Sequence, residues 1–148
     1  MAVTYDKIAY PLIEKGLKGI IDNEFQNVYV SPKFEMVGNE CIRINLIGSS
    51  LEESNANYER RIYEIVLRYY FNCDMHKQLN NEAVKNKIDR LKKHLLDNQT
   101  KDTATAKWVW LDIQNIEYNV EDEENDDAED LYIAEFTLEL TNHNQWSA

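Results

Sequence analysis

The chain has 148 residues, of which 43% are hydrophobic and 11% aromatic, and its formal net charge at pH 7 is -11. A chain of this size can bury roughly 70% of the surface that its unfolded form exposes, so we expect a single domain over residues 1–148 and exclude global disorder. No apolar stretch is long enough to cross a membrane as a helix. The N-terminal sequence MAVTYDKIAY lacks the basic start and the apolar block of a secretory signal.

The negative charge is concentrated in one segment, residues 121–130, which holds eight of the 27 acidic residues and no base. Without these eight charges the net charge falls from -11 to -3, so the rest of the chain is nearly balanced. The simpler interpretation is a solvated, mobile hairpin loop, because like charges packed this densely resist ordering. The alternative is a surface that faces a lumen or a partner. Its acids are Glu121, Asp122, Glu123, Glu124, Asp126, Asp127, Glu129 and Asp130.

The first half of the chain predicts one helix and two strands. Apolar residues recur at three- and four-residue steps from Ile8 to Ile21, which is typical of an amphipathic helix. Thr4 is a candidate cap for this helix, and Pro11 requires the helix to begin or bend near it. A strand is expected at about residues 27–30, closed by Ser31-Pro32, and a second at residues 41–47, with Ile42, Ile44 and Leu46 on one face.

Polar segments on either side of that second strand are candidate contact surfaces. Residues 48–59 are rich in Ser, Asn and Glu, and we expect a long loop there. Residues 32–40 form a second polar connection. Long ordered loops in compact domains are often functional.

Residues 60–71 are the strongest strand of the sequence. Apolar side chains occupy both of its faces, which predicts a central strand with cover on each side. Glu64 and Arg68 lie four residues apart on the same face, and we interpret them as a charge pair at the sheet surface. Cys41 and Cys73 both lie in strand-like segments and are expected to be reduced, packed thiols rather than a disulfide.

The second half predicts a helix and a hairpin. Asn80 or Asn81 caps a helix whose buried stripe is Val84, Ile88, Leu91 and Leu95. In residues 107–120, strict alternation places Val109, Leu111 and Ile113 opposite Trp108, Trp110, Ile116 and Tyr118. Residues 131–141 alternate cleanly and should pair with 107–120, with the acidic segment at the tip. The expected fold is α+β: a mixed, mainly antiparallel sheet of about five strands with two main helices, in the order helix-strand-strand-strand-helix-strand-strand.

No catalytic or metal-binding motif is present in the sequence. His76, His94 and His143 have no second ligand at metal spacing, and the cysteines form no CxxC pair. GxSxG, P-loop and GxGxxG motifs are absent. Position 127 of the acidic segment is Asp, where a calcium-binding EF-hand needs Gly. We therefore predict no enzymatic activity, no catalytic or metal-binding residue and no cofactor.

The order of the predicted elements resembles the tail terminator, or tail-completion, proteins of long-tailed bacteriophages. An amphipathic first helix is followed by VYVSP at Val28–Pro32, CIRINLIG at Cys41–Gly48 and RRIYEIVLRYYF at Arg60–Phe71, then by a helix and a final hairpin. The resemblance covers most of the chain but contains no invariant catalytic motif, and the acidic insertion has no counterpart in it.

The resemblance implies a structural virion protein that assembles into a ring, commonly a hexamer. Such a ring caps the tail tube, joins it to a neck or head-closure protein, and lets DNA pass without binding it specifically. It implies production in the host cytoplasm, a place in the virion and no contact with a membrane. Within this interpretation, subunit contacts are expected at Pro32, Lys33, Phe34, Ser49, Leu51, Glu52 and Asn55.

Two alternatives remain. One is another neck component, such as a head-closure or head-tail joining protein. The other is an acidic inhibitor that mimics DNA to occupy a DNA-binding enzyme. Such mimics usually spread acids over a whole face, whereas here the acids are concentrated in ten residues.

Overall fold

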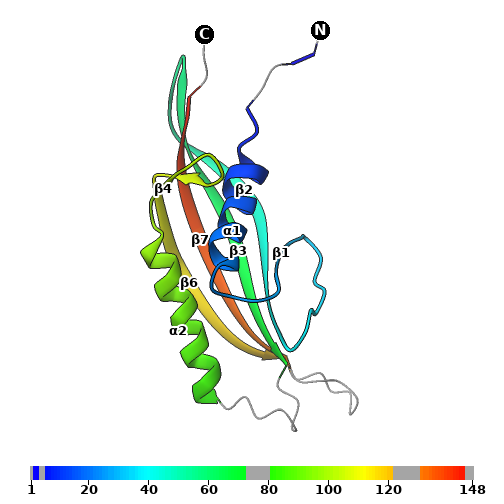
Figure 1. Cartoon of the computed structure of the whole chain (residues 1–148). Helices are drawn as coiled ribbons and strands as arrows, with labels where there is room; N and C mark the ends of the chain where they lie inside the picture. Colours follow the sequence, from blue (N-terminus) through cyan, green and yellow to red (C-terminus); the bar gives the residue numbers. More distant parts are fainter. Residues whose placement is uncertain (1, 4–5, 73–80, 122–130, 146–148) are drawn as a thin grey trace.

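The computed structural model describes residues 2–3, 6–72, 81–121 and 131–145, and its centre is a five-stranded sheet in the order β1-β2-β3-β7-β6 (Figure 1). β1 runs parallel to β2 and every other pair in this sheet is antiparallel, so the α+β fold with a mainly antiparallel mixed sheet is confirmed. The strands are β1 (Val28–Val30), β2 (Glu40–Asn55), β3 (Tyr58–Asn72), β6 (Trp110–Glu121) and β7 (Leu131–Gln145). A separate two-stranded pair consists of β4 (Lys101–Asp102) and β5 (Lys107–Trp108).

The first helix begins close to Pro11. A π-helical turn, η1 (Ala9–Glu14), leads into α1 (Lys15–Asp22), and the N–H groups of Leu12 and Ile13 both donate to the carbonyl oxygen of Ile8. Pro11 is the third residue of η1. It has no N–H to donate, and the first N–H groups of a helix have no partner within the helix, so proline is tolerated there. Thr4, the candidate cap, lies outside the described residues.

The second helix, α2 (Asn81–Asp97), buries the stripe that the sequence predicts. Val84, Ile88, Leu91 and Leu95 are all buried. Asn81 is the first helical residue rather than the cap, and Asn80 lies outside the described residues.

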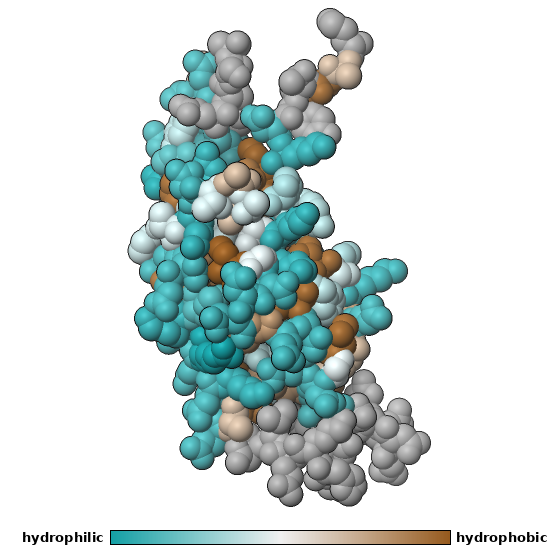
Figure 2. All heavy atoms as spheres, in the orientation of Figure 1, coloured by the Kyte–Doolittle hydropathy of each residue, from teal (hydrophilic) through white to brown (hydrophobic). Residues whose placement is uncertain are grey.

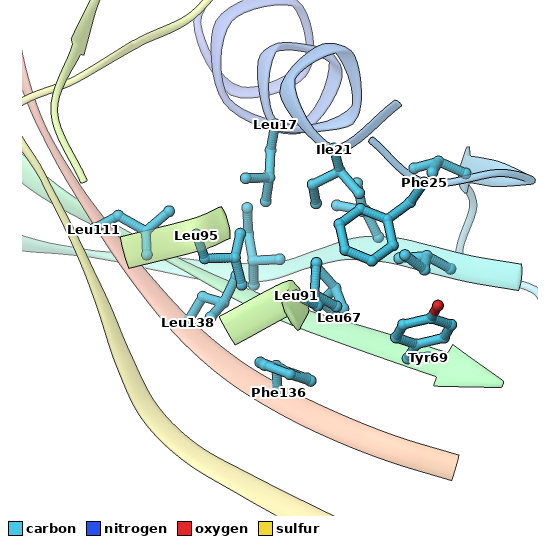
Figure 3. Close-up of a cluster of buried hydrophobic side chains, with 14 of the residues drawn as sticks. Leu17, Ile21, Phe25, Leu67, Tyr69, Leu91, Leu95, Leu111, Phe136 and Leu138 are labelled. Carbon is cyan, nitrogen blue, oxygen red and sulfur yellow. The ribbon is translucent and has the colours of Figure 1, made fainter. Parts of the chain in front are cut away.

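Both helices pack on the same face of the sheet and enclose one core with it (Figure 3). Leu17, Ile21 and Phe25 come from α1 and the residues after it, and Leu91 and Leu95 come from α2. They meet side chains of β3, β6 and β7, among them Leu67, Tyr69, Leu111, Phe136 and Leu138. Alternation along the strands supplies this face, because successive side chains of a strand point to opposite sides.

β3 is central, as expected, but the sheet is covered differently from the prediction. The other face of β3 carries Ile62, Glu64, Val66 and Arg68, none of them fully buried, and no described helix packs on it. Segment 31–39 covers only one end of this face, at Tyr70, whose ring centroid lies 4.4 Å from that of Phe34. The expectation of cover on both faces was therefore wrong. The apolar side chains on this second face of β3 do not require a further layer of helices. They are half-buried between the side chains of neighbouring strands, and one loop covers the end of the face.

Strict alternation in residues 107–120 was also wrong. The strand is interrupted at Val109, so Trp108 and Leu111 are both fully buried while Trp110 is exposed. A second irregularity lies between Ile113 and Asn115, and it lets both Ile113 and Ile116 pack against the core. Bulges insert a residue and change which face the following side chains occupy. The pairing of β6 with β7, up to Glu121 opposite Leu131, is as predicted.

Candidate assembly surface

The region from Gly48 to Glu59 is a paired β-hairpin and not the expected loop. β2 continues to Asn55, β3 begins at Tyr58, and the two strands stay paired up to Asn55 opposite Tyr58. The N–H of Asn57 donates to Oδ1 of Asn55 at 3.1 Å, a local bond that orders the two-residue turn. The sequence hid this pairing because the strands are polar on both faces, so no apolar alternation marked them.

The hairpin projects beyond the helices at one end of the molecule (Figure 1). Residues 49–57 are exposed throughout, and they include four of the expected contact residues: Ser49, Leu51, Glu52 and Asn55. Leu51, the one large apolar side chain of this segment, is 53% exposed. The face seen in Figure 2 is mostly hydrophilic, with small separated hydrophobic areas.

A polar network fixes the base of the hairpin. Oε1 of Glu59 accepts hydrogen bonds from Nε of Arg61 at 3.0 Å and from Nδ2 of Asn144 at 2.8 Å. The same amide also donates to the hydroxyl of Tyr63, and Arg61 donates to Oγ of Ser49. The hydrogen bond from Arg61 holds the pKa of the Glu59 carboxyl below its ordinary value, and the bond from Asn144 adds to this effect. These bonds join β2, β3 and β7, so the hairpin is built as a rigid extension of the sheet.

The other expected contact residues, Pro32, Lys33 and Phe34, lie on segment 31–39. They are exposed, but the segment is tethered at several points. The hydroxyl of Tyr29 donates to the carbonyl of Glu35 and accepts from its N–H, and Arg43 Nη1 donates to the carbonyl of Pro32 at 2.8 Å. Gly38 adopts a φ of +70°, a left-handed conformation that suits glycine.

The two expected contact segments lie at opposite ends of β2 (Figure 1). Residues 40–48 of β2 lie between them, which corresponds to roughly 30 Å at about 3.3 Å per residue. The structure therefore does not bring them together. Any ring contact that uses both must involve two separate patches on the subunit.

Several other residues that the sequence analysis singled out take part in packing and pairing within the fold. Arg68 pairs with Glu135 of β7 at 2.8 Å, so the expected pair with Glu64 was wrong; the neighbouring strand places a carboxylate opposite Arg68. Nε2 of His94 lies 2.8 Å from the carbonyl oxygen of Ile20, where the protonated nitrogen donates a hydrogen bond that ties α2 to α1. Cys41 is buried and free, and burial raises the pKa of its thiol. Cys73 and His76 lie outside the described residues.

Within residues 2–3, 6–72, 81–121 and 131–145, no group of three or more His, Cys, Asp or Glu side chains is arranged to hold a metal ion. In the same part of the chain, no helix is long and apolar enough to cross a membrane. The acidic segment falls beyond these ranges except for Glu121, the last residue of β6. Asp122, Glu123, Glu124, Asp126, Asp127, Glu129 and Asp130 lie outside the described residues.

Comparison with known proteins adds no identity. No protein-family model matches the chain, and no curated protein matches it at a significant level.

Proposed function

We propose that this chain is a structural subunit that assembles head-to-tail into a ring, and that it acts as a tail terminator, capping a phage tail tube and joining it to the neck. The order of elements supports the resemblance on which this proposal rests. The observation that carries it is the hairpin of residues 49–57, a paired and exposed extension of the sheet that carries a half-exposed Leu51.

A rigid extension of this kind suits assembly. Ordering a flexible loop on binding costs conformational entropy, whereas a pre-formed hairpin has already lost that entropy on folding. In a head-to-tail ring each subunit presents one patch to the neighbour on one side and a different patch to the neighbour on the other. A projecting hairpin on one side of the sheet can serve as one of the two patches.

Native mass spectrometry and a tail-completion assay test the proposal with two matched variants. Leu51→Ser removes the exposed apolar side chain from the hairpin, and Leu96→Ser removes one that is 39% exposed on α2. We expect the wild-type chain to form a closed homo-oligomer, free or on purified tail tubes. Leu51→Ser should stay folded, lose mass as the ring dissociates, and fail to complete tails. Leu96→Ser should behave as the wild type does.

Other outcomes separate the alternatives. A Leu51→Ser variant that forms the same oligomer and completes tails of normal length contradicts the role of the hairpin. Binding to purified heads, without binding to tubes, favours another neck component. A strict monomer that inhibits a DNA-binding enzyme favours a DNA mimic.

A further inference from the structure

The outer edge of β6 carries backbone groups that point away from the sheet. β6 forms one margin of the sheet, because β7 is the only strand that pairs with it among the described residues (Figure 1). In an antiparallel pair, alternate residues direct their N–H and C=O groups towards the partner strand, and the residues between them direct theirs outward. Leu111 belongs to the outward set. Its N–H donates to the carbonyl oxygen of Gln99 at 2.8 Å, and its own carbonyl accepts from Nε2 of Gln99 at 3.0 Å.

The same alternation identifies the outward groups farther along the strand. Leu111 is paired with Leu140 of β7, and Ile113, Ile116 and Tyr118 are paired with residues 138, 136 and 134. These partners alternate regularly along β7, so all three residues of β6 also direct their N–H and C=O groups outward. No described residue forms a hydrogen bond with these outward groups. The edge of β6 is therefore covered at Leu111 and open from Ile113 to Tyr118.

The opposite margin of the sheet is protected, whereas this one is not. Beyond Ile44, β2 has no described strand beside it, but the N–H of Leu46 donates to the carboxylate of Glu14, and two register shifts interrupt the edge. Bulges, proline and lysine are devices that keep an edge strand from pairing with another chain. Residues 115–121 of β6 contain none of them. The regular part of β6 is thus a free template for a further strand.

The side chains around this edge are acidic. Neither β6 nor β7 contains a lysine or an arginine. On the face that no described helix covers, the register sets Asp112 opposite Glu139 and Glu117 opposite Glu135. Like charges directly opposite each other on neighbouring strands are destabilising. Glu135 pairs with Arg68 of β3, but the other three carboxylates form no ion pair with a described residue.

This charge decides which strand the edge can take. A second copy of β6 would place further acids beside Asp112 and Glu117 and would supply no base, so the side chains oppose self-pairing. A strand with lysine or arginine at alternate positions would place these side chains on the uncovered face, beside the acids. Its other side chains would lie next to Ile116 and Tyr118 on the helix-covered face, where Tyr118 is 46% exposed.

We propose that the outer edge of β6 takes an extended basic segment of another protein as an added strand. Main-chain hydrogen bonds form at Ile116 and Tyr118, and alternate basic side chains lie beside Asp112 and Glu117. Exposed sheet edges bind extended peptides in this way, with affinity from the main chain and specificity from alternate side chains. The inference goes beyond the proposed ring and does not rest on it, because the edge belongs to a single subunit.

Two short capped peptides of the same composition test the added strand. Lysine and valine alternate in the first peptide and form two separate blocks in the second. Fluorescence polarisation should show tighter binding of the alternating peptide, because only that order places every lysine on one face of a strand. Hydrogen exchange should slow at the N–H groups of Ile116 and Tyr118 when it binds. Methylation of alternate backbone nitrogens in the peptide should abolish both effects, with no change to the protein.

Matched variants of the protein separate the edge from its charge. Tyr118→Pro removes an outward N–H, whereas Tyr118→Val retains it, so we expect the first to lose binding and the second to keep it. Glu117→Lys should weaken binding strongly. Glu64→Lys changes an exposed acid on β3, which β7 separates from β6, and should have little effect. If Tyr118→Pro fails to fold by circular dichroism, the methylated peptide tests the main-chain contact instead.

Two outcomes would overturn the inference. Equal binding of both peptides, or binding that leaves exchange at Ile116 and Tyr118 unchanged, would show charge attraction without an added strand. Protection of the same N–H groups that grows with protein concentration in the absence of peptide would assign the edge to a second copy. A monomeric wild type that binds the alternating peptide supports the inference and counts against the ring, so the two proposals fail separately.

Discussion

Glu59 shows how one carboxylate can link the hairpin to the sheet. It joins Arg61 on its own strand to Asn144 on β7, and the exposed fraction of its side chain is only 15%. Because these partners stabilise the ionised form, the pKa of Glu59 in the folded chain lies below its ordinary value of 4.5. A carboxyl group with a lowered pKa contributes stability above the pKa of the unfolded chain, and that contribution is lost as the pH falls through the pKa of the folded chain.

The Glu59→Gln variant tests this linkage. Gln keeps the shape of the side chain but cannot ionise, so we expect the variant to be less stable than the wild type at pH 7. The difference in unfolding free energy should shrink as the pH falls below 4.5 and through the lowered pKa. Urea denaturation at several pH values measures it. A difference that stays constant from pH 7 to pH 3 would contradict the assignment.

At the scale of the elements, the first helix contains two glycines in different surroundings. A Cβ built at Gly16 would lie 2.9 Å from both Cα of Ala106 and the carbonyl oxygen of Thr105, which are backbone atoms that cannot easily move aside. A Cβ at Gly19 would meet nothing within 4 Å. Only Gly16 is therefore required by packing, where α1 passes close to the β4–β5 connection.

The same substitution at the two positions should have opposite effects. Gly19→Ala should raise the unfolding free energy by about 0.5–1 kcal/mol, because alanine loses less conformational entropy in a helix. Gly16→Ala should lower it by roughly 1–3 kcal/mol through overpacking. Chemical denaturation of the two variants beside the wild type is sufficient. Equal shifts of the same sign would show that α1 does not approach residues 105–106 this closely.

Elements with an apolar face could be predicted from the sequence, and polar ones could not. The stripe of α2 and the core face of β7 follow from their periodicity, and both are confirmed. The hairpin of residues 48–59 depends on pairing with β3, which in turn pairs with β7, and this long-range support leaves no local pattern. The break at Val109 and the register shift near Ile113 likewise leave no local pattern in the sequence. The expected alternation placed Trp108 and Leu111 on opposite faces, whereas both are buried.

At the scale of the whole molecule, the candidate site could be predicted only in part. Exposure of Leu51 and Phe34 follows from their polar surroundings in the sequence, and both side chains are exposed. That their segments lie at opposite ends of β2 depends on strand length, which the loop assignment hid.

If the chain forms the proposed ring, the concentration of charge in residues 121–130 matters most there. β6 and β7 pair up to Glu121 and Leu131, so the acidic segment connects the two strands at one end of the sheet. Six copies of its eight acids would gather 48 negative charges in a hexamer. If they surround the opening, they should repel phosphates and keep passing DNA from adhering, because nucleic-acid binding is dominated by neutralisation of phosphates by Lys and Arg. If instead they dock on a basic neck protein, joining should weaken as salt rises.

Replacing the eight acids by Asn and Gln separates these roles from simple solvation. A lumen role predicts normal joining of heads to tails but slower DNA ejection by the variant. A docking role predicts that the wild type joins heads less well as salt rises, and that the variant joins poorly at every salt concentration. Both rates can be measured on assembled particles from low to high salt. A variant indistinguishable from the wild type in joining and ejection across that range would leave only a solvated connection, and the functional interpretation of the segment would be dropped.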